Sequence, residues 1–174
     1  MKIEKRWENN RSKMISYIVF VAYLFLLTWL VLFKFAFTIE EIPHLRQLNL
    51  IPFHYETSVA YITHMKEVIY NILIFVPAGV YFTAFLGKRK WWLGIGESFF
   101  VSLTFETVQW IFSIGVSDIT DLIGNTLGSG VGAVLFAFLG KILPKKRMSM
   151  INGIGAVVEV VGIALLSMLF VANK

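Results

Sequence analysis

Five apolar segments constrain this chain more than any other feature of its sequence. They cover approximately residues 14–37, 68–86, 91–116, 122–143 and 152–172. A bilayer core of roughly 30 Å requires about 20 helical residues, and each segment is long enough to cross it. Of the 174 residues, 57% are apolar and 16% charged, whereas soluble domains carry about 25% charged residues. We therefore predict an all-α integral membrane protein with five transmembrane helices, forming one membrane domain over residues 1–174.

Clusters of basic residues predict how these helices are oriented. Five Lys and Arg side chains precede the first segment, and three consecutive basic residues stand in each of two connections, at residues 88–90 and 145–147. The remaining connections carry only Arg46 and Lys66. Because Lys and Arg gather in the cytoplasmic loops of membrane proteins, we predict an N-terminus inside and a C-terminus outside.

The longest predicted connection is an outer loop at residues 38–67. Ile62, Met65 and Ile69 fall on one helical face there, which is typical of an amphipathic helix lying in the membrane interface. We expect part of this loop to form such a helix and to lead into the second span.

Polar side chains within the predicted spans gather in the outer half of the membrane. Ionisable and amide groups are costly in hydrocarbon, so they usually face a protein interior or a wet cavity. Four spans contribute to a predicted ligand-binding groove that faces outward. Its candidate residues are Lys34, Asn71, Glu106, Gln109, Asp118, Asp121 and Asn125. Two aromatic side chains, Trp29 and Trp110, are candidates for holding an acyl chain beside it.

Helix packing is the main alternative interpretation of these residues. Amides and hydroxyls bond across helix interfaces, and small residues four apart let two backbones approach closely. The fourth span has such a repeat in Gly124, Gly128 and Gly132. Packing explains the amides well, but it explains three carboxylates with at most one nearby cation poorly.

The acids raise the question of metal binding or catalysis. Glu106, Asp118 and Asp121 offer the oxygen ligands that hard cations prefer. However, two Asp residues three apart are also typical of a helix N-cap and first turn. No nucleophile motif with a base and no phosphate loop is present. We expect no catalytic residue, no metal, no cofactor and no nucleic-acid partner.

Five motifs in order resemble the VanZ-like family of bacterial membrane proteins. They are TWLVLFK at 28–34, NLIPF at 49–53, NILIFVPAG at 71–79, SLTFETVQ at 102–109 and IGVSDITDLIGNTLG at 114–128. The resemblance implies a multi-pass protein of the bacterial cytoplasmic membrane. It also implies low-level resistance to teicoplanin, a glycopeptide antibiotic with a lipid tail.

The resemblance also places the family's polar motif residues on this chain. They correspond to Asn71, Glu106, Gln109, Asp118, Asp121 and Asn125. Many relatives carry an Arg shortly before the first Asp of the last motif, and residues 114–117 contain none here. We expect the partner to be a membrane lipid, a lipid-linked cell-wall precursor or the lipid-tailed antibiotic. An intramembrane enzyme acting on an envelope lipid and a scaffold for other envelope proteins are the alternatives.

Overall fold

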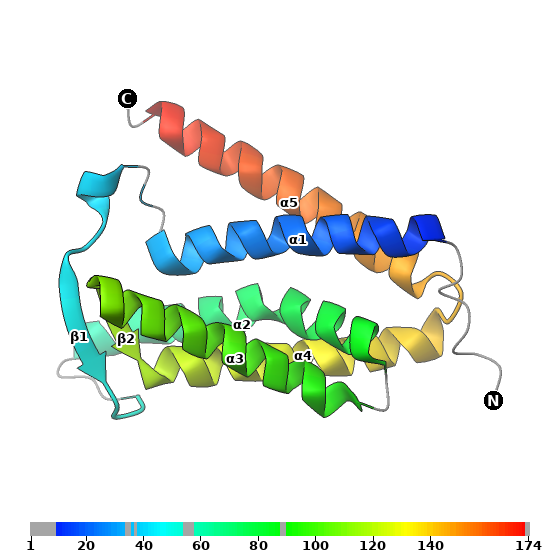
Figure 1. Cartoon of the computed structure of the whole chain (residues 1–174), viewed down its shortest axis with the longest axis horizontal. Coiled ribbons are helices and arrows are strands. Elements are labelled where there is room, and N and C mark those ends of the chain that lie inside the picture. The colour runs from blue at the N-terminus through cyan, green and yellow to red at the C-terminus, as the bar shows by residue number, and fades with distance from the viewer. Residues whose placement is uncertain (1–9, 34–35, 37, 54–57, 88–89, 173–174) are drawn as a thin grey trace. The chain divides into compact units, whose positions relative to one another are not determined.

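A computed structural model describes residues 10–33, 36, 38–53, 58–87 and 90–172 of the chain (Figure 1). The described part contains five α-helices, which are α1 (Asn10–Phe33), α2 (Ser58–Leu86), α3 (Trp91–Phe112), α4 (Ile119–Ile142) and α5 (Arg147–Ala172). Between them lie a short 3-10 helix, η1 (Ile39–Glu41), and two strands, β1 (Leu45–Asn49) and β2 (Ile114–Asp118).

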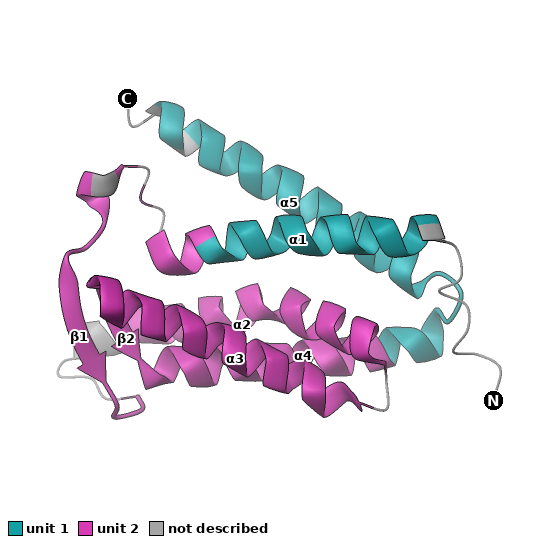
Figure 2. Cartoon of the chain, in the orientation of Figure 1, with its two compact units in different colours: residues 1–28, 138–174 teal, residues 29–137 magenta. Residues whose placement is uncertain are grey.

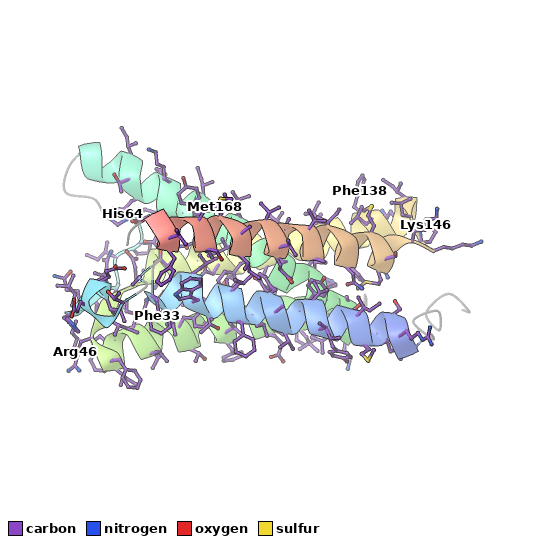
Figure 3. All side chains as sticks on the ribbon, turned by 90° about the horizontal axis from the view of Figure 1, so that it is seen from above. Phe33, Arg46, His64, Phe138, Lys146 and Met168 are labelled. Carbon is purple, nitrogen blue, oxygen red and sulfur yellow. The ribbon has the colours of Figure 1, made fainter. Side chains whose placement is uncertain are left out.

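Four of the described helices are long and apolar enough to cross a membrane. They are Arg11–Phe33 in α1, Ile62–Leu86 in α2, Ile119–Ile142 in α4 and Arg147–Met168 in α5. Most side chains projecting from α5, including the exposed Met168, are apolar (Figure 3). The predicted class of helical membrane protein is thus confirmed.

Helix α3 is not among these four candidate spans. Its 22 residues span about 33 Å at 1.5 Å per residue, which is long enough for a bilayer core. Its buried face, however, carries two serines, a glutamate and a glutamine. That α3 crosses the membrane, and that the N-terminus lies inside, stay predictions.

The chain divides into two compact units, coloured separately in Figure 2. Unit 1 consists of residues 1–28 and 138–174, and unit 2 of residues 29–137. In unit 1, the buried Asn152 of α5 donates a hydrogen bond of 2.8 Å to the buried Ser16 of α1. Unit 2 contains the end of α1, both strands, α2, α3 and most of α4.

Close packing of α2 against α4 depends on glycines. A Cβ atom added to Gly128 would lie 2.9 Å from the Cα atom of Ile72, and one added to Gly132 would lie 2.8 Å from the backbone nitrogen of Val80. Such distances are shorter than real Cβ atoms show. The same holds in the other direction, because a Cβ on Gly79 of α2 would clash with the α4 backbone. The glycine repeat therefore fixes the spacing of these two helices.

The two strands form a small parallel sheet that the sequence analysis did not predict. Leu45 pairs with Ile114, and the register continues to Asn49 and Asp118. The third span was predicted to continue to residue 116, but α3 ends at Phe112 and the chain enters β2. Part of the predicted outer loop is thus β1, whereas its last residues belong to α2, which begins at residue 58 rather than 68.

Arg46 of β1 holds the end of α3 in place. Ser113, which follows the helix, has the left-handed φ of 57°. The Arg46 guanidinium donates to the Ser113 hydroxyl and to the carbonyl oxygen of Ile111, both at 2.9 Å. It also lies 5.6 Å from the ring centre of Trp110. These contacts include a bond to one of the carbonyl groups that lack a partner within the helix at its C-terminus. They also hold the chain where it leaves α3 and enters β2.

Candidate functional site

A cavity of about 560 Å³ lies within unit 2. Helix α2, the C-terminal half of α3 and the first two turns of α4 supply most of its wall, and the end of α1 closes it. Its lining residues are Leu30, Val31, Glu67, Tyr70, Asn71, Ile74, Glu106, Gln109, Asp121 and Asn125. This volume is in the range of sites that bind small molecules, about 300–1,000 Å³.

The cavity has a buried polar floor and an exposed rim. Glu106, Gln109 and Asn125 on the floor are only 5%, 2% and 1% exposed. Tyr70 at the rim is 60% exposed. Glu67, also at the rim, pairs with His64 at 3.0 Å. A ligand group that reaches the floor is therefore removed from solvent, where polar contacts are stronger.

Two carboxylates in the cavity are fixed by neighbouring elements. The Glu106 carboxylate accepts a hydrogen bond of 2.8 Å from the backbone N–H of Asp118, which is where β2 meets α4. Asp121 accepts one of 2.7 Å from the side-chain amide of Asn71. Each acid is thus positioned by a hydrogen-bond donor from a neighbouring element.

Three amides present a consistent pattern of donors and acceptors. The amide nitrogens of Asn71, Gln109 and Asn125 all donate to protein groups. Gln109 donates to the carbonyl oxygen of Val31 at 2.9 Å, and Asn125 donates to the Ser102 hydroxyl at 2.8 Å. The side-chain oxygens of Gln109 and Asn125 are buried and have no hydrogen-bond partner in the described structure. Buried polar atoms nearly always have partners, so these two oxygens indicate a missing donor.

The structure brings together five of the predicted groove residues, namely Asn71, Glu106, Gln109, Asp121 and Asn125. Asp118 does not line the cavity, because its carboxylate accepts from the Asn49 side chain at 3.0 Å and from the Thr120 backbone at 2.7 Å. It acts as the N-cap of α4 and ties that helix to β1. Lys34 lies outside the described residues.

The two aromatic candidates lie elsewhere in unit 2. The indole N–H of Trp29 donates to the carbonyl oxygen of Ala36 at 3.2 Å. Trp110 is 44% exposed beneath Arg46. Neither is among the cavity's lining residues, and the apolar wall comes instead from Leu30, Val31 and Ile74.

Helix packing accounts for other polar residues near the cavity. The Ser129 hydroxyl donates to that of Ser98 at 2.8 Å, and Asn125 bonds Ser102 in the same manner one turn along α3. Such side-chain bonds hold two helices together in a membrane. The serines therefore have structural partners. Helix packing does not require the carboxylates of the cavity or the side-chain oxygens of Gln109 and Asn125, which have no partner in the described structure.

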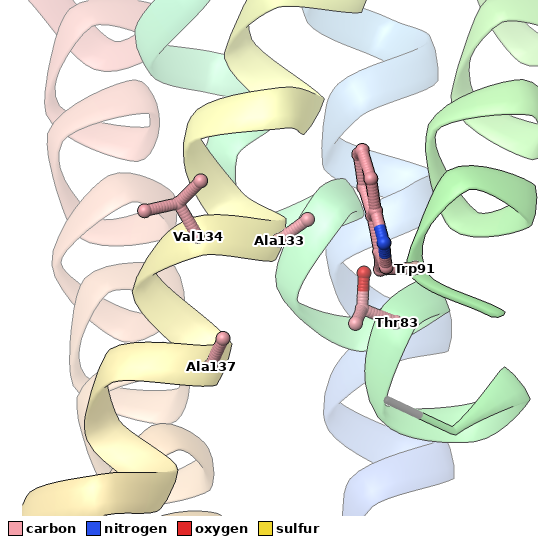
Figure 4. Close-up of a pocket in the computed structure, with 5 residues that line it drawn as sticks. All are labelled: Thr83, Trp91, Ala133, Val134 and Ala137. Carbon is pink, nitrogen blue, oxygen red and sulfur yellow. The ribbon is translucent and has the colours of Figure 1, made fainter. Parts of the chain in front are cut away.

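A second cavity, of about 250 Å³, is apolar (Figure 4). It is lined by Thr83, Trp91, Ala133, Val134 and Ala137. Its sole polar oxygen from a lining side chain is the Thr83 hydroxyl, which is buried and has no partner in the described part of the chain. A polar headgroup would lose its hydration there without gaining bonds, so the larger cavity is the better candidate for such a ligand.

Sequence reasoning missed three residues of the site. Glu67 was assigned to the end of the predicted outer loop, and Tyr70 lies in the first turn of the predicted second span, where it was not singled out. Asn49 was noted only within a motif. Its role depends on a strand pairing between segments 69 residues apart, and no local signal indicates that pairing.

Metal binding finds no support in the described residues. Among them, no group of three or more His, Asp or Glu side chains is placed to hold an ion. The acids of the cavity are spread over its wall and are bonded to protein donors, so we derive no chemistry from a metal.

The fold and the cavity together define a helical membrane protein with a buried acidic site. A family model described as VanZ/LLP1 matches residues 20–140, and the chain belongs to this family. It is similar to Protein VanZ of Enterococcus faecium, with 35% identity over 162 residues that cover 92% of this chain and 93% of the relative. No solved structure gives a significant match.

Proposed function

We propose that this protein binds an amphiphilic molecule of the bacterial envelope in the larger cavity and thereby confers low-level resistance to teicoplanin. The bound molecule is a membrane lipid, a lipid-linked wall precursor or the lipid-tailed antibiotic itself. One observation carries the proposal. Side chains from α2, α3 and α4 place three carboxylates and three amides around one 560 Å³ cavity, although such groups are costly inside a membrane protein.

Charge distribution supports an outward-facing site in the cytoplasmic membrane. The basic connection at residues 88–90 precedes α3, whereas Glu106 and Gln109 lie near the opposite, C-terminal end of that helix. The first turns of α4 carry Asp121 and Asn125, and the basic residues 145–147 follow its far end. If the basic ends are cytoplasmic, the cavity lies on the outer side, where glycopeptides act.

The mixed lining supports an amphiphile rather than a soluble ligand. Leu30, Val31 and Ile74 provide hydrocarbon contacts beside the polar floor. A molecule with a polar head and an acyl chain satisfies both kinds of surface, because its head bonds the floor while its chain stays in apolar surroundings.

The proposal is tested by measuring susceptibility to teicoplanin and to untailed vancomycin in a sensitive Gram-positive host that expresses the protein. We expect selective protection against teicoplanin, lost in Asp121→Asn and Glu106→Gln. Glu97→Gln is the matched control, because Glu97 lies on α3 but is exposed and outside the cavity. Full protection by both cavity variants at parental protein level would contradict the proposal.

Lipid extracts of the same cultures separate binding from catalysis. A binding protein leaves envelope lipids and drug chemically unchanged, so mass spectrometry should find the same species with and without expression. A new species that depends on Glu106 or Asp121 would replace binding with a reaction.

A further inference from the structure

Two buried amide oxygens on the cavity floor lack hydrogen-bond donors. The side chains of Gln109 and Asn125 line the cavity and are only 2% and 1% exposed. Their oxygens, Oε1 and Oδ1, accept no hydrogen bond from any residue that the structure describes. Buried polar atoms nearly always have partners, because an unpartnered one loses its bonds to water and gains nothing. The floor is therefore completed by a group that donates hydrogen bonds.

Neighbouring contacts determine which atom of each amide is left open. The Gln109 nitrogen donates to the carbonyl oxygen of Val31 at 2.9 Å, and a carbonyl can only accept. A Cβ atom added to Gly115 would lie 3.6 Å from the same nitrogen, so this edge of the amide faces α1 and β2. The Asn125 nitrogen donates to the Ser102 hydroxyl at 2.8 Å. In both amides the nitrogen is bonded to protein and the oxygen is not.

We propose that the headgroup bound on this floor carries two neutral hydroxyls, which donate to the side-chain oxygens of Gln109 and Asn125. This inference rests on the proposed function and names the chemistry of its ligand. Each hydroxyl has one O–H donor, so two hydroxyls supply one donor to each open oxygen. Ester, ether and choline groups have no such donor.

Burial favours a neutral donor over a charged one. The two open atoms are uncharged amide oxygens, and both side chains are almost completely shielded from solvent. Glu106, the acid on the floor, already accepts from the backbone N–H of Asp118. Removing an ammonium from water costs far more free energy than removing a hydroxyl, and neutral oxygens supply no charge to offset that cost.

The hydroxyls are carried by a lipid headgroup or by a soluble polyol such as glycerol. The apolar wall formed by Leu30, Val31 and Ile74 favours the lipid, because it provides contacts for a hydrocarbon chain beside the polar floor. Both sources share the O–H donors, so the test measures the effect of the donors first and that of the chain second.

The test is native mass spectrometry of the full chain in lauryldimethylamine oxide, a detergent that has no hydroxyl to compete. Monoolein, whose glycerol head has two free hydroxyls, is compared with propyl oleate, which has the same chain, ester and three-carbon head without them. We expect monoolein to bind on the order of tenfold more tightly, since two neutral hydrogen bonds distinguish the pair. Equal binding would overturn the inference and leave water as the donor on the floor.

Apolar variants of similar size locate the hydroxyl site. Gln109→Met and Asn125→Leu each remove one open oxygen, so the ratio of monoolein affinity to propyl oleate affinity should fall in each and reach about one in the double variant. This ratio compares two lipids on the same folded protein. A parental ratio in the double variant would overturn the inference.

Ser129→Ala is the matched control for Asn125→Leu. Each change breaks one 2.8 Å bond between α3 and α4, to Ser98 and to Ser102 respectively, but Ser129 does not line the cavity. We expect the parental ratio in Ser129→Ala. A ratio that falls as far as in Asn125→Leu would assign the effect to helix packing and overturn the inference.

A charged donor is tested with oleyl alcohol and oleylamine, which carry one hydroxyl or one ammonium on the same chain. The inference predicts that Gln109→Met weakens binding of the alcohol. Tighter binding of oleylamine that is lost in Gln109→Met would assign the floor to an ammonium and overturn the inference.

Free glycerol and a blocked cavity complete the experiment. A lipid source predicts that monoolein binds on the order of tenfold or more tightly than glycerol, because its chain adds apolar contacts; equal affinity would support the hydroxyls but assign them to a soluble polyol. Ile74→Trp fills the cavity from its wall. If monoolein and propyl oleate bind alike and Ile74→Trp weakens both, the hydroxyl inference fails while the proposed lipid binding stands. If no lipid binds, both fail.

Discussion

The contact between α2 and α4 makes the effect of one methyl group calculable. In Gly128→Ala, the new Cβ would overlap the carbonyl oxygen of Ile72, its nearest atom, and would lie 2.9 Å from the Ile72 Cα atom, whereas ordinary contact begins at 3.4 Å. The two backbones must therefore separate by more than the roughly 0.5 Å that the Cα distance alone requires. Because both partners are backbone, no side chain can rotate away. Overpacking of this kind costs about 1–3 kcal/mol.

A second glycine on the same helix provides the matched control. Gly130 lies two residues from Gly128, and its nearest neighbour to a new Cβ would be the flexible end of Ile95 at 3.9 Å. Both variants gain the same helix propensity, about 1 kcal/mol over glycine. The propensity cancels in the comparison, which leaves the packing cost alone.

The assay is thermal unfolding of the two purified variants in the same detergent. With about 2–4 °C per kcal/mol for a chain of this size, Gly128→Ala should melt several degrees below Gly130→Ala. It should also weaken the site, because the same shift would lengthen the 2.7 Å bond between Asn71 and Asp121 toward the limit of a hydrogen bond. Identical melting of the two variants would refute the packing of α2 on α4.

Three further changes test other parts of unit 2, each by thermal unfolding in detergent. Asn49→Asp places a carboxylate where the Asn49 amide now donates to Asp118 at 3.0 Å, so it should lower the free energy of unfolding by about 1–3 kcal/mol. Adding Asp118→Asn should restore stability, and no recovery in the double variant would count against this bond. Thr83→Val removes a buried hydroxyl that has no partner in the described structure, so it should stabilise the protein by about 1 kcal/mol. A loss of stability would instead show that the hydroxyl forms a hydrogen bond. Arg46→Ala removes two hydrogen bonds and the contact with Trp110 at the end of α3. Because Arg46 is exposed, the loss in the free energy of unfolding should be only about 1 kcal/mol. An unchanged thermal midpoint would show that Arg46 does not stabilise that helix end.

Much of the site could be predicted because a membrane makes polar residues conspicuous. Asn71, Glu106 and Gln109 each stand out in an otherwise apolar segment, and the rise per residue places them in the outer half of their predicted spans. Depth along a helix needs only the rise per residue, so it can be read without knowing which helices are neighbours.

What could not be predicted depends on pairing between distant segments. The sequences of β1 and β2 show no alternation of apolar and polar residues, and their contact joins segments about 69 residues apart. Asp118 was expected in the groove with Asp121, but α4 begins one residue later and the Asp118 carboxylate accepts from Asn49 instead. The spacing of the two Asp residues did indicate an N-cap and a first-turn acid as the alternative, whereas the bond to Asn49 depends on the strand pairing.

The position of Glu67 and Tyr70 at the cavity rim could not be predicted for a related reason. Glu67 and Tyr70 lie on a helix that begins ten residues before the predicted span, because the polar residues of its first turns resemble a loop. Only the extended helix shows that they border the same cavity as Asn71.

Photo-crosslinking at Ile74 tests the central claim, ligand binding in the cavity, most directly. A photoreactive residue at this lining position is compared with one at Val131, which is 46% exposed on α4 and outside the cavity. The account predicts that Ile74 captures one class of envelope molecule enriched over Val131, and that Asp121→Asn abolishes the enrichment. The same mixture of captured lipids at both positions, unchanged by Asp121→Asn, would contradict it.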